Sequence, residues 1–183
     1  MDPNILLELF EDMSKEELLN ILSENIGYKA FFSGMISEML LKRELSTYSE
    51  LTSIKKQKDV SKSERGDFLI EYKNQFYIVE LKKLTNVKID YINDSYTGSI
   101  DLKRFPTLIN NQKISAVPRD FFNVLAILVI NSCKDYKFYF LDGKRIFSNA
   151  KCGKDYYTSS LLINTRTSPF LSSNIVEVLD NMD

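Results

Sequence analysis

The sequence predicts a single α/β domain in which helices cover a mixed central β-sheet. Three observations carry this prediction. Apolar residues recur at helical spacing along the first 45 residues, residues 67–83 have the pattern of a β-hairpin, and residues 121–130 form an unbroken apolar run. Such a run, rich in β-branched residues, is typical of a central strand buried on both faces. A chain of 183 residues suits one domain, and we expect N-terminal helices over 1–46 and a sheet core with a C-terminal helix over 47–183.

Two short helices are expected first. Asp2, followed by proline, is a typical helix start, and this helix should run to about Met13. Ser14 and Glu17 have the spacing of a capping box, which predicts the start of a second helix. Gly27 is expected to end that second helix.

A third helix is expected over residues 29–45. Its apolar residues recur at helical spacing and are predicted to pack inward: Phe31, Phe32, Met35, Ile36, Met39 and Leu40. Glu38 follows Phe31 by seven residues, so it should lie at the edge of that apolar face.

The hairpin of residues 67–83 is the most informative segment. Its two β-rich runs flank a polar turn at Lys73–Gln75, and a two-residue loop would place Asp67 opposite Glu80. Side chains alternate along a strand, so Glu80 and Lys82 share one face. Like charges directly opposite one another cost roughly 0.2–1 kcal/mol of sheet stability. A divalent cation is the simplest group that would offset this cost.

The remaining elements are strands and one helix. Residues 51–54 and 95–102 are expected to be strands, the second with alternating apolar positions. Residues 136–141 should pair with the apolar run of 121–130. Asn174 has the sequence context of an N-cap, which predicts a terminal helix.

Composition excludes several chemistries. The chain has no histidine and only two cysteines, so histidine triads, histidine-based zinc sites and CxxC sites are absent. Phosphate-binding glycine motifs are also absent. A general base would have to be Glu, Asp, Lys, Tyr or a metal-bound hydroxide. No run could span a bilayer and no signal peptide is apparent, so we expect a cytosolic protein with no membrane partner.

The net charge of −1 hides an uneven distribution. Residues 2–24 are strongly acidic, whereas residues 55–65 carry a cluster of basic side chains: Lys55, Lys56, Lys58, Lys62 and Arg65. Positive charge thus gathers just before the hairpin, as expected for a phosphate-binding surface. A solvated basic loop is the alternative that charge alone leaves open.

The hairpin residues can be assigned chemical roles. Mg²⁺ prefers oxygen ligands and is commonly held by one or two carboxylates plus waters and phosphates. Asp67 and Glu80 would supply carboxylates, the backbone carbonyl of Leu81 a third oxygen, and Glu38 an outer ligand. Lys82 would orient the attacking water or neutralise charge in the transition state.

Phosphate contacts are predicted on both sides of these groups. Arg65 and Lys83 adjoin the hairpin carboxylates directly, and Lys58 and Lys62 belong to the basic stretch before them. These four residues are the predicted nucleic-acid contacts.

The sequence Gly66-Asp67, followed by Glu80-Leu81-Lys82 at the end of an apolar strand, resembles the PD-(D/E)XK nuclease superfamily, whose fold is restriction-endonuclease-like. Gly66 stands where the proline of the family name would be. A looser similarity to short restriction-endonuclease-like prokaryotic proteins rests on further segments: Gly34 with Glu38, Tyr96-Thr97-Gly98, Phe122 to Ala126, and Pro169-Phe170. The resemblance implies a nuclease core made of a helix, a mixed sheet and a flanking helix.

The first functional hypothesis is a Mg²⁺-dependent DNA endonuclease of restriction type, with Mn²⁺ as the alternative metal. A homodimer would match the two-fold symmetry of duplex DNA. Two alternatives remain: a structure-specific nuclease for junctions or repair intermediates, and a catalytically silent nuclease fold that serves as a DNA-binding module.

Overall fold

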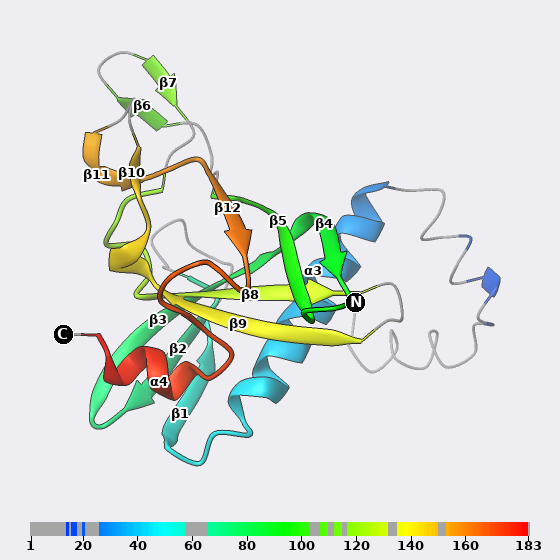
Figure 1. The fold of residues 1–183 in the computed structure, drawn as a ribbon, viewed down its shortest axis with the longest axis horizontal. Helices are drawn as coiled ribbons and strands as arrows, with labels where there is room; N and C mark the ends of the chain where they lie inside the picture. The colour runs from blue at the N-terminus through cyan, green and yellow to red at the C-terminus, as the bar shows by residue number, and fades with distance from the viewer. Residues whose placement is uncertain are drawn as a thin grey trace, which may run out of the picture. The chain divides into compact units, whose positions relative to one another are not determined.

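The computed structural model describes residues 14, 16–17, 20, 26–57, 66–102, 107–109, 112–114, 117–131, 135–149 and 153–182 (Figure 1). The helix predicted from Asp2 to Met13 lies outside the described residues. The chain divides into two units, residues 1–37 and 38–183, which are described separately below. Element labels follow Figure 1.

The first unit contains the predicted capping box. The backbone N–H of Ser14 donates to a carboxylate oxygen of Glu17 (2.8 Å), and the N–H of Glu17 donates to Oγ of Ser14 (3.2 Å). These reciprocal bonds satisfy backbone donors at a helix start, so the prediction at Ser14 is confirmed. Helix α3 (Ile26–Leu45) begins in this unit and continues into the second. Gly27 lies inside α3, so the prediction that Gly27 ends a helix is wrong.

The inward face of α3 also differs from the prediction. Leu41 and Leu45 are fully buried, whereas four of the apolar side chains predicted to pack inward are exposed: Phe31, Met35, Ile36 and Met39. Apolar residues occur around the whole circumference of this helix. Spacing alone therefore could not select the buried face.

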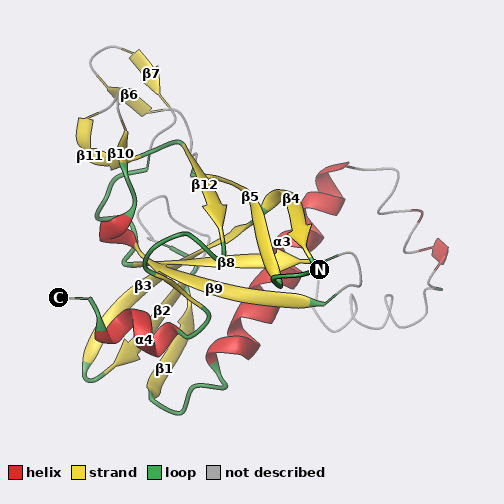
Figure 2. Ribbon diagram, viewed as in Figure 1, coloured by secondary structure: helices red, strands yellow, loops and turns green. Residues whose placement is uncertain are grey.

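A six-stranded mixed sheet forms the centre of the second unit. Its strands are β1 (Leu51–Lys56), β2 (Phe68–Tyr72), β3 (Gln75–Lys83), β8 (Val124–Ile130), β9 (Tyr136–Asp142) and β13 (Leu171–Ser172). They lie side by side in that order. The β3–β8 pair is parallel, and the other neighbours are antiparallel. Figure 2 shows how strands dominate this unit.

Smaller sheets and a C-terminal helix complete the unit. A three-stranded sheet has the order β12-β5-β4, and β6–β7 and β10–β11 form two-stranded pairs. The bounds are β4 (Thr85–Asp90), β5 (Ser95–Asp101), β6 (Thr107–Ile109), β7 (Gln112–Ile114), β10 (Ser148–Asn149), β11 (Gly153–Tyr157) and β12 (Ser160–Asn164). A single 3₁₀ turn, Gly143–Arg145, follows β9, and helix α4 covers Ile175–Asp180.

Two hydrophobic cores lie on opposite faces of the six-stranded sheet, because alternate residues of β8 belong to different cores. Val124, Ala126 and Leu128 join the core that α4 and the C-terminal half of α3 cover. Leu125 and Ile127 join the core that strands β5 and β12 cover. The structure is therefore mixed α/β, as predicted. In the described part of the chain, however, helices cover one face and a small sheet covers the other.

The predicted hairpin is present in the predicted register. Phe68 pairs with Val79 and Tyr72 with Gln75, so the loop is the two-residue Lys73–Asn74. Both loop residues have positive φ, 48° and 61°, as the hairpin turns that match strand twist require. The regular pairing ends at Phe68–Val79, and the N–H of Asp67 also donates to the carbonyl of Val79 (2.8 Å). The predicted backbone pair of Asp67 with Glu80 is therefore not part of the ladder.

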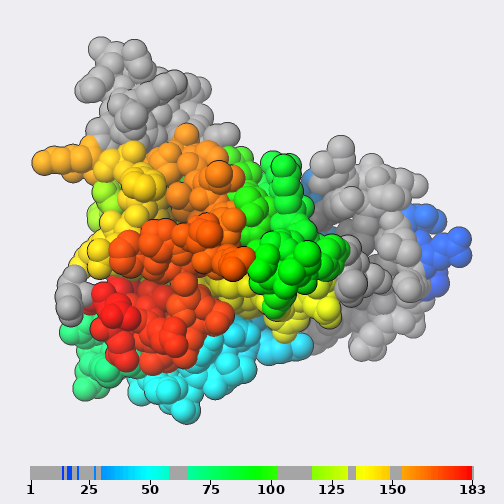
Figure 3. Space-filling view, viewed as in Figure 1, coloured from blue at the N-terminus to red at the C-terminus, as the bar shows by residue number. Residues whose placement is uncertain are grey.

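Most other predicted elements are also confirmed. Strands β1, β5 and β9 match the predicted runs, and β8 is buried on both faces, although it begins at Val124 rather than Phe121. Asn174 caps α4 by accepting a bond from the N–H of Val176 (2.9 Å). The residues in red in Figure 3, which include α4, lie at the surface of the molecule. Among the described helices, none is both long enough and apolar enough to cross a membrane.

Candidate active site

The site begins with an irregularity at the start of β2. Gly66 has a φ of 67°, and a Cβ added there would lie 2.4 Å from Cγ2 of Ile78 and 2.9 Å from the carbonyl oxygen of Val79. Only glycine adopts this backbone without strain, and proline, with φ fixed near about −65°, is excluded. The glycine in place of the proline of the PD-(D/E)XK name thus has a local structural reason.

The turn at Gly66 ends the regular hydrogen bonding between β2 and β3, and beyond it the Asp67 side chain supplies an acceptor for a β3 backbone donor. The N–H of Asp67 donates to the carbonyl of Val79 (2.8 Å), and its own carbonyl accepts from Gln57 (2.9 Å). The next ladder donor on β3, the N–H of Leu81, donates to Oδ2 of Asp67 (2.6 Å). The carboxylate is therefore held against β3, one residue past the end of the regular pairing.

The same geometry orients the backbone carbonyl of Leu81. The N–H and C=O of one strand residue point to the same edge, and alternate residues share an edge. Since the Leu81 N–H bonds Asp67, the Leu81 carbonyl faces the Asp67 side of β3. This is the direction required of the predicted third oxygen ligand.

Glu80 and Lys82 lie on one face of β3, as predicted. Nζ of Lys82 donates a hydrogen bond of 2.5 Å to Oε1 of Glu80. Glu80 is buried, with 7% of its surface exposed. Their face is the one covered by the small sheet, because the intervening Leu81 packs against the opposite core. A buried carboxylate needs such a partner, since an unpaired buried charge is costly.

The charges of the two hairpin strands interact. Burial, followed by repulsion from Glu80, raises the pKa of Asp67 to about 6. The Leu81 N–H and the Lys82 ammonium act in the opposite direction, and Glu38 adds a further repulsion. The charges of Glu80, Lys82 and Glu38 therefore all influence the pKa of Asp67.

Glu38 reaches this region from α3, but its carboxylate has a cationic partner. Nζ of Lys56, at the end of β1, forms an ion pair with Oε2 of Glu38. The side chain of Glu38 is 22% exposed and that of Lys56 46% exposed. In the sequence, Lys56 belongs to the basic stretch, where charge alone shows no sign of this pairing. The alternation of β1, with Ile54 and Lys56 on one face, was the signal that could have directed it to α3.

Of the four predicted nucleic-acid contacts, only Lys83 lies in the part of the chain that the structure describes, and it does not face the site. Lys83 is exposed at the end of β3, where its side chain lies on the face opposite to Lys82. Lys58, Lys62 and Arg65 lie outside the described residues.

The donor set can be compared with the needs of Mg²⁺. Within the described ranges, no group of three or more Asp, Glu or Cys side chains is close enough to hold a metal ion. One or two carboxylates, completed by waters and phosphates, are the usual protein ligands of Mg²⁺. Asp67, Glu80 and the Leu81 carbonyl match that smaller set, and their residues fit such an ion.

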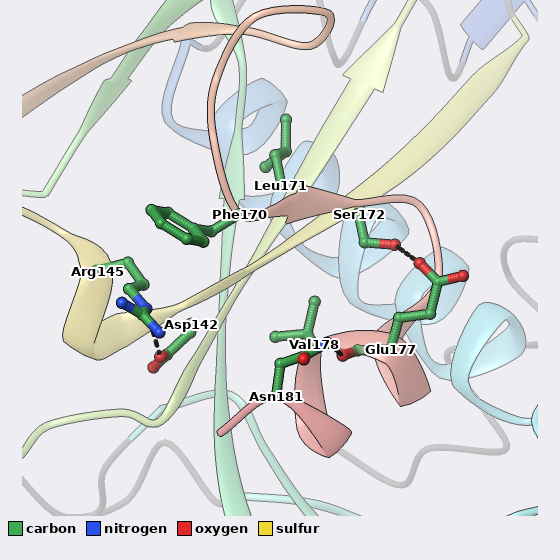
Figure 4. Close-up of a pocket in the computed structure, with 8 residues that line it drawn as sticks. All are labelled: Asp142, Arg145, Phe170, Leu171, Ser172, Glu177, Val178 and Asn181. Atoms are coloured by element: carbon green, nitrogen blue, oxygen red, sulfur yellow. Dashed lines mark hydrogen bonds and ion pairs between the residues drawn. The ribbon is translucent and has the colours of Figure 1, made fainter. Parts of the chain in front are cut away.

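A pocket of about 460 Å³ lies elsewhere, between the end of β9 and α4. In Figure 4, Arg145 lies beside Asp142 and Phe170, and the Ser172 hydroxyl points to Glu177. The Arg145 guanidinium carbon lies 4.5 Å from the Phe170 ring centroid. None of the residues that line this pocket belongs to the predicted site.

Comparison with known proteins does not test these assignments. A scan against protein-family models gave no match, and searches of curated proteins and of solved structures gave no significant match. The resemblance to the PD-(D/E)XK superfamily stays a prediction.

Proposed function

We propose that this protein is a metal-dependent DNA endonuclease that hydrolyses phosphodiester bonds. The observation that carries the proposal is the convergence of Asp67, Glu80 and Lys82 at the open end of the β2–β3 hairpin. Two carboxylates share one field there, as the raised pKa of Asp67 reflects, and an ammonium contacts one of them. A carboxylate with a raised pKa, such as Asp67, beside a lysine is typical of catalytic sites rather than of exposed strand ends.

The residues that would hold Mg²⁺ or Mn²⁺ are Asp67, Glu80 and the Leu81 carbonyl. When bound, the ion would lower the pKa of a water ligand and stabilise negative charge on the phosphodiester. The Leu81 N–H, bonded to Oδ2 of Asp67, fixes the orientation of that carboxylate. Because Glu80 is buried, few water molecules would compete with the metal ion for its carboxylate.

Lys82 has the position of a group that acts on the attacking water. Its ammonium lies on the Glu80 side of the strand, and the Lys82 side chain as a whole is 27% exposed. It would orient the water and neutralise charge that develops in the transition state.

Incubation of the purified protein with plasmid and genomic DNA, with Mg²⁺ or Mn²⁺ and with EDTA as control, tests this function. Discrete bands that need the metal indicate restriction-type cleavage, and a metal-dependent smear indicates a non-specific nuclease. Cleavage confined to branched DNA indicates a structure-specific nuclease. No cleavage of any of these substrates with either metal contradicts the proposal.

A catalytically silent module is the second candidate, and one observation favours it. Glu80 and Glu38 each have an internal ammonium partner, Lys82 and Lys56, so the fold stabilises them without a metal. Calorimetric titration with Mg²⁺ and Mn²⁺ separates the candidates, because a silent module would show no binding heat with either ion.

A further inference from the structure

We propose that Lys56 is a substrate-binding residue of this site, whose ammonium exchanges the Glu38 carboxylate for a backbone phosphate when nucleic acid binds. The inference rests on the proposed nuclease function and deepens it. It gives Lys56, one member of the basic stretch, a specific phosphate contact beside Asp67, and it makes the ion pairing of Glu38 depend on whether substrate is bound.

The position of Lys56 is set by the edge of the sheet. Lys56 pairs with Phe68, and the next residue, Gln57, donates to the carbonyl of Asp67 (2.9 Å). Lys56 therefore directly precedes the residue that bonds the backbone of Asp67. Because Ile54 packs on the helix-covered core, strand alternation directs Lys56 to the same face.

The position of Glu38 is set by the helix that covers that face. Glu38 precedes the buried Leu41 and Leu45 by three and seven residues, which places all three on one side of α3. Core packing thus fixes both members of the ion pair, and only their side-chain ends can rearrange.

Exposure shows which member can reach a ligand. The Lys56 side chain is 46% exposed and that of Glu38 22%, so the cation lies on the solvent side of the pair. An exposed ion pair is worth about 0–1 kcal/mol, whereas charge-assisted bonds to phosphate are among the strong ones. A phosphate can therefore displace the carboxylate.

The charge balance favours this exchange. Glu80 and Lys82 act on Asp67 from the face that the small sheet covers, and Glu38, paired with Lys56, acts on it from the helix-covered face, so three carboxylates surround two ammonium groups at this end of the sheet. A divalent cation would reverse the excess of negative charge and attract a phosphate. Release of Glu38 from Lys56 would then leave its carboxylate free to face the Asp67 region, on which its charge already acts.

The test is metal-free DNA binding in EDTA, measured with a fluorescent duplex over a range of salt concentrations. Lys56→Met should weaken binding roughly tenfold at low salt and reduce the slope of log K against log salt by about 0.9, the loss expected for one phosphate contact. Lys56→Arg should retain the slope. Lys73→Met is the matched control, because Lys73 is also an exposed lysine in an ion pair, with Asp180, but lies at the turn end of the hairpin, and it should leave the slope unchanged.

Because Glu38 and phosphate compete for Lys56, removing the Glu38 charge should have the opposite effect on DNA binding. Glu38→Gln should tighten binding, because it removes a carboxylate that competes with phosphate for Lys56, and this gain should vanish when Lys56→Met is also present. An ion pair that only joins α3 to β1 predicts equal losses of thermal stability in both single variants and an unchanged salt slope. That result would overturn the inference.

Failure of the inference and failure of the proposed function give different results. Wild-type cleavage with an unaltered salt slope in Lys56→Met overturns only the role of Lys56. A wild-type protein that neither binds nor cleaves DNA overturns both.

Discussion

The two ends of the β2–β3 hairpin hold carboxylates in opposite ways. At the turn end, Oδ1 of Asp180 accepts two hydrogen bonds of 2.6 Å each, one from Nζ of Lys73 and one from the Tyr72 hydroxyl. These bonds, that of Lys73 first, lower the pKa of Asp180. At the open end, burial and Glu80 raise the pKa of Asp67 to about 6.

The difference separates a structural contact from a candidate catalytic one. The Asp180 carboxylate is ionised at little cost and ties α4 to the hairpin turn. The Asp67 carboxylate is ionised against its surroundings, and the fold tolerates this because Gly66 and the Leu81 N–H fix its position. Strain of this kind is typical of functional sites.

The largest expected effect is on activity. Lys82→Ala should reduce metal-dependent DNA cleavage by about 10³-fold or more, because it removes charge stabilisation in the transition state. Lys73→Ala, at the turn end of the same hairpin, is the matched control and should cleave at the wild-type rate. Initial rates on plasmid DNA measure both, and wild-type cleavage by Lys82→Ala would show that the site is assigned wrongly.

Gly66→Ala should have the largest effect on stability. A Cβ there would lie 2.4 Å from Ile78 Cγ2 at a φ of 67°, so the free energy of unfolding should fall by about 2–3 kcal/mol. Gly34→Ala is the control: a Cβ at that helical position would meet nothing within 4 Å. It should raise stability by up to about 1 kcal/mol. Urea denaturation measures both, and equal effects would argue against strain at Gly66.

Asp67→Asn should stabilise the fold while it abolishes cleavage. Because the pKa of Asp67 rises from 3.8 to about 6 on folding, the native state binds the proton more tightly than the unfolded state. Wild-type stability should therefore fall as pH rises from about 4 to about 6. At pH 7 the variant should be more stable by about 1–3 kcal/mol, and at pH 3 the two should agree. A variant less stable than wild type at pH 7 would contradict the repulsion between Asp67 and Glu80.

The smallest effect is expected at the turn end. The pKa of Asp180 is lowered on folding, so its contribution is present above the unfolded pKa and is lost as pH falls through the folded one. Asp180→Asn should therefore cause a small loss of stability at pH 7 that disappears in acid, the reverse of Asp67→Asn. Thermal melts at the two pH values measure this, and a gain at pH 7 would remove the contrast between the ends.

Local patterns predicted the β2–β3 hairpin better than the architecture around it. The hairpin register followed from a two-residue turn and strand alternation, and both act within a few residues of the chain. The buried face of α3 depends instead on which distant strands it meets, and the exposed Phe31 and Met39 show that apolar spacing did not decide it.

The sequence also did not predict that a small sheet covers the second face of the six-stranded sheet, and the reason is related. Strand β4 does alternate, with Val87 and Ile89 more buried than their neighbours, and this signal could have been used. Strand β12 reads Leu161-Leu162-Ile163 without alternation, although Leu162 is 75% exposed. Strand β13 has two residues, too few for any periodicity.

The short chain separation within the site bears on the order of folding. Asp67 and Leu81 are joined across 14 residues, whereas Ile78 meets Asn123, at the start of the parallel β3–β8 pairing, across 45. Contacts between near residues close small loops and form faster than distant ones. We expect the hairpin, with its pair of acids, to assemble before the parallel ladder. The slow step would then close the remaining sheet around a charged pair that is already in place.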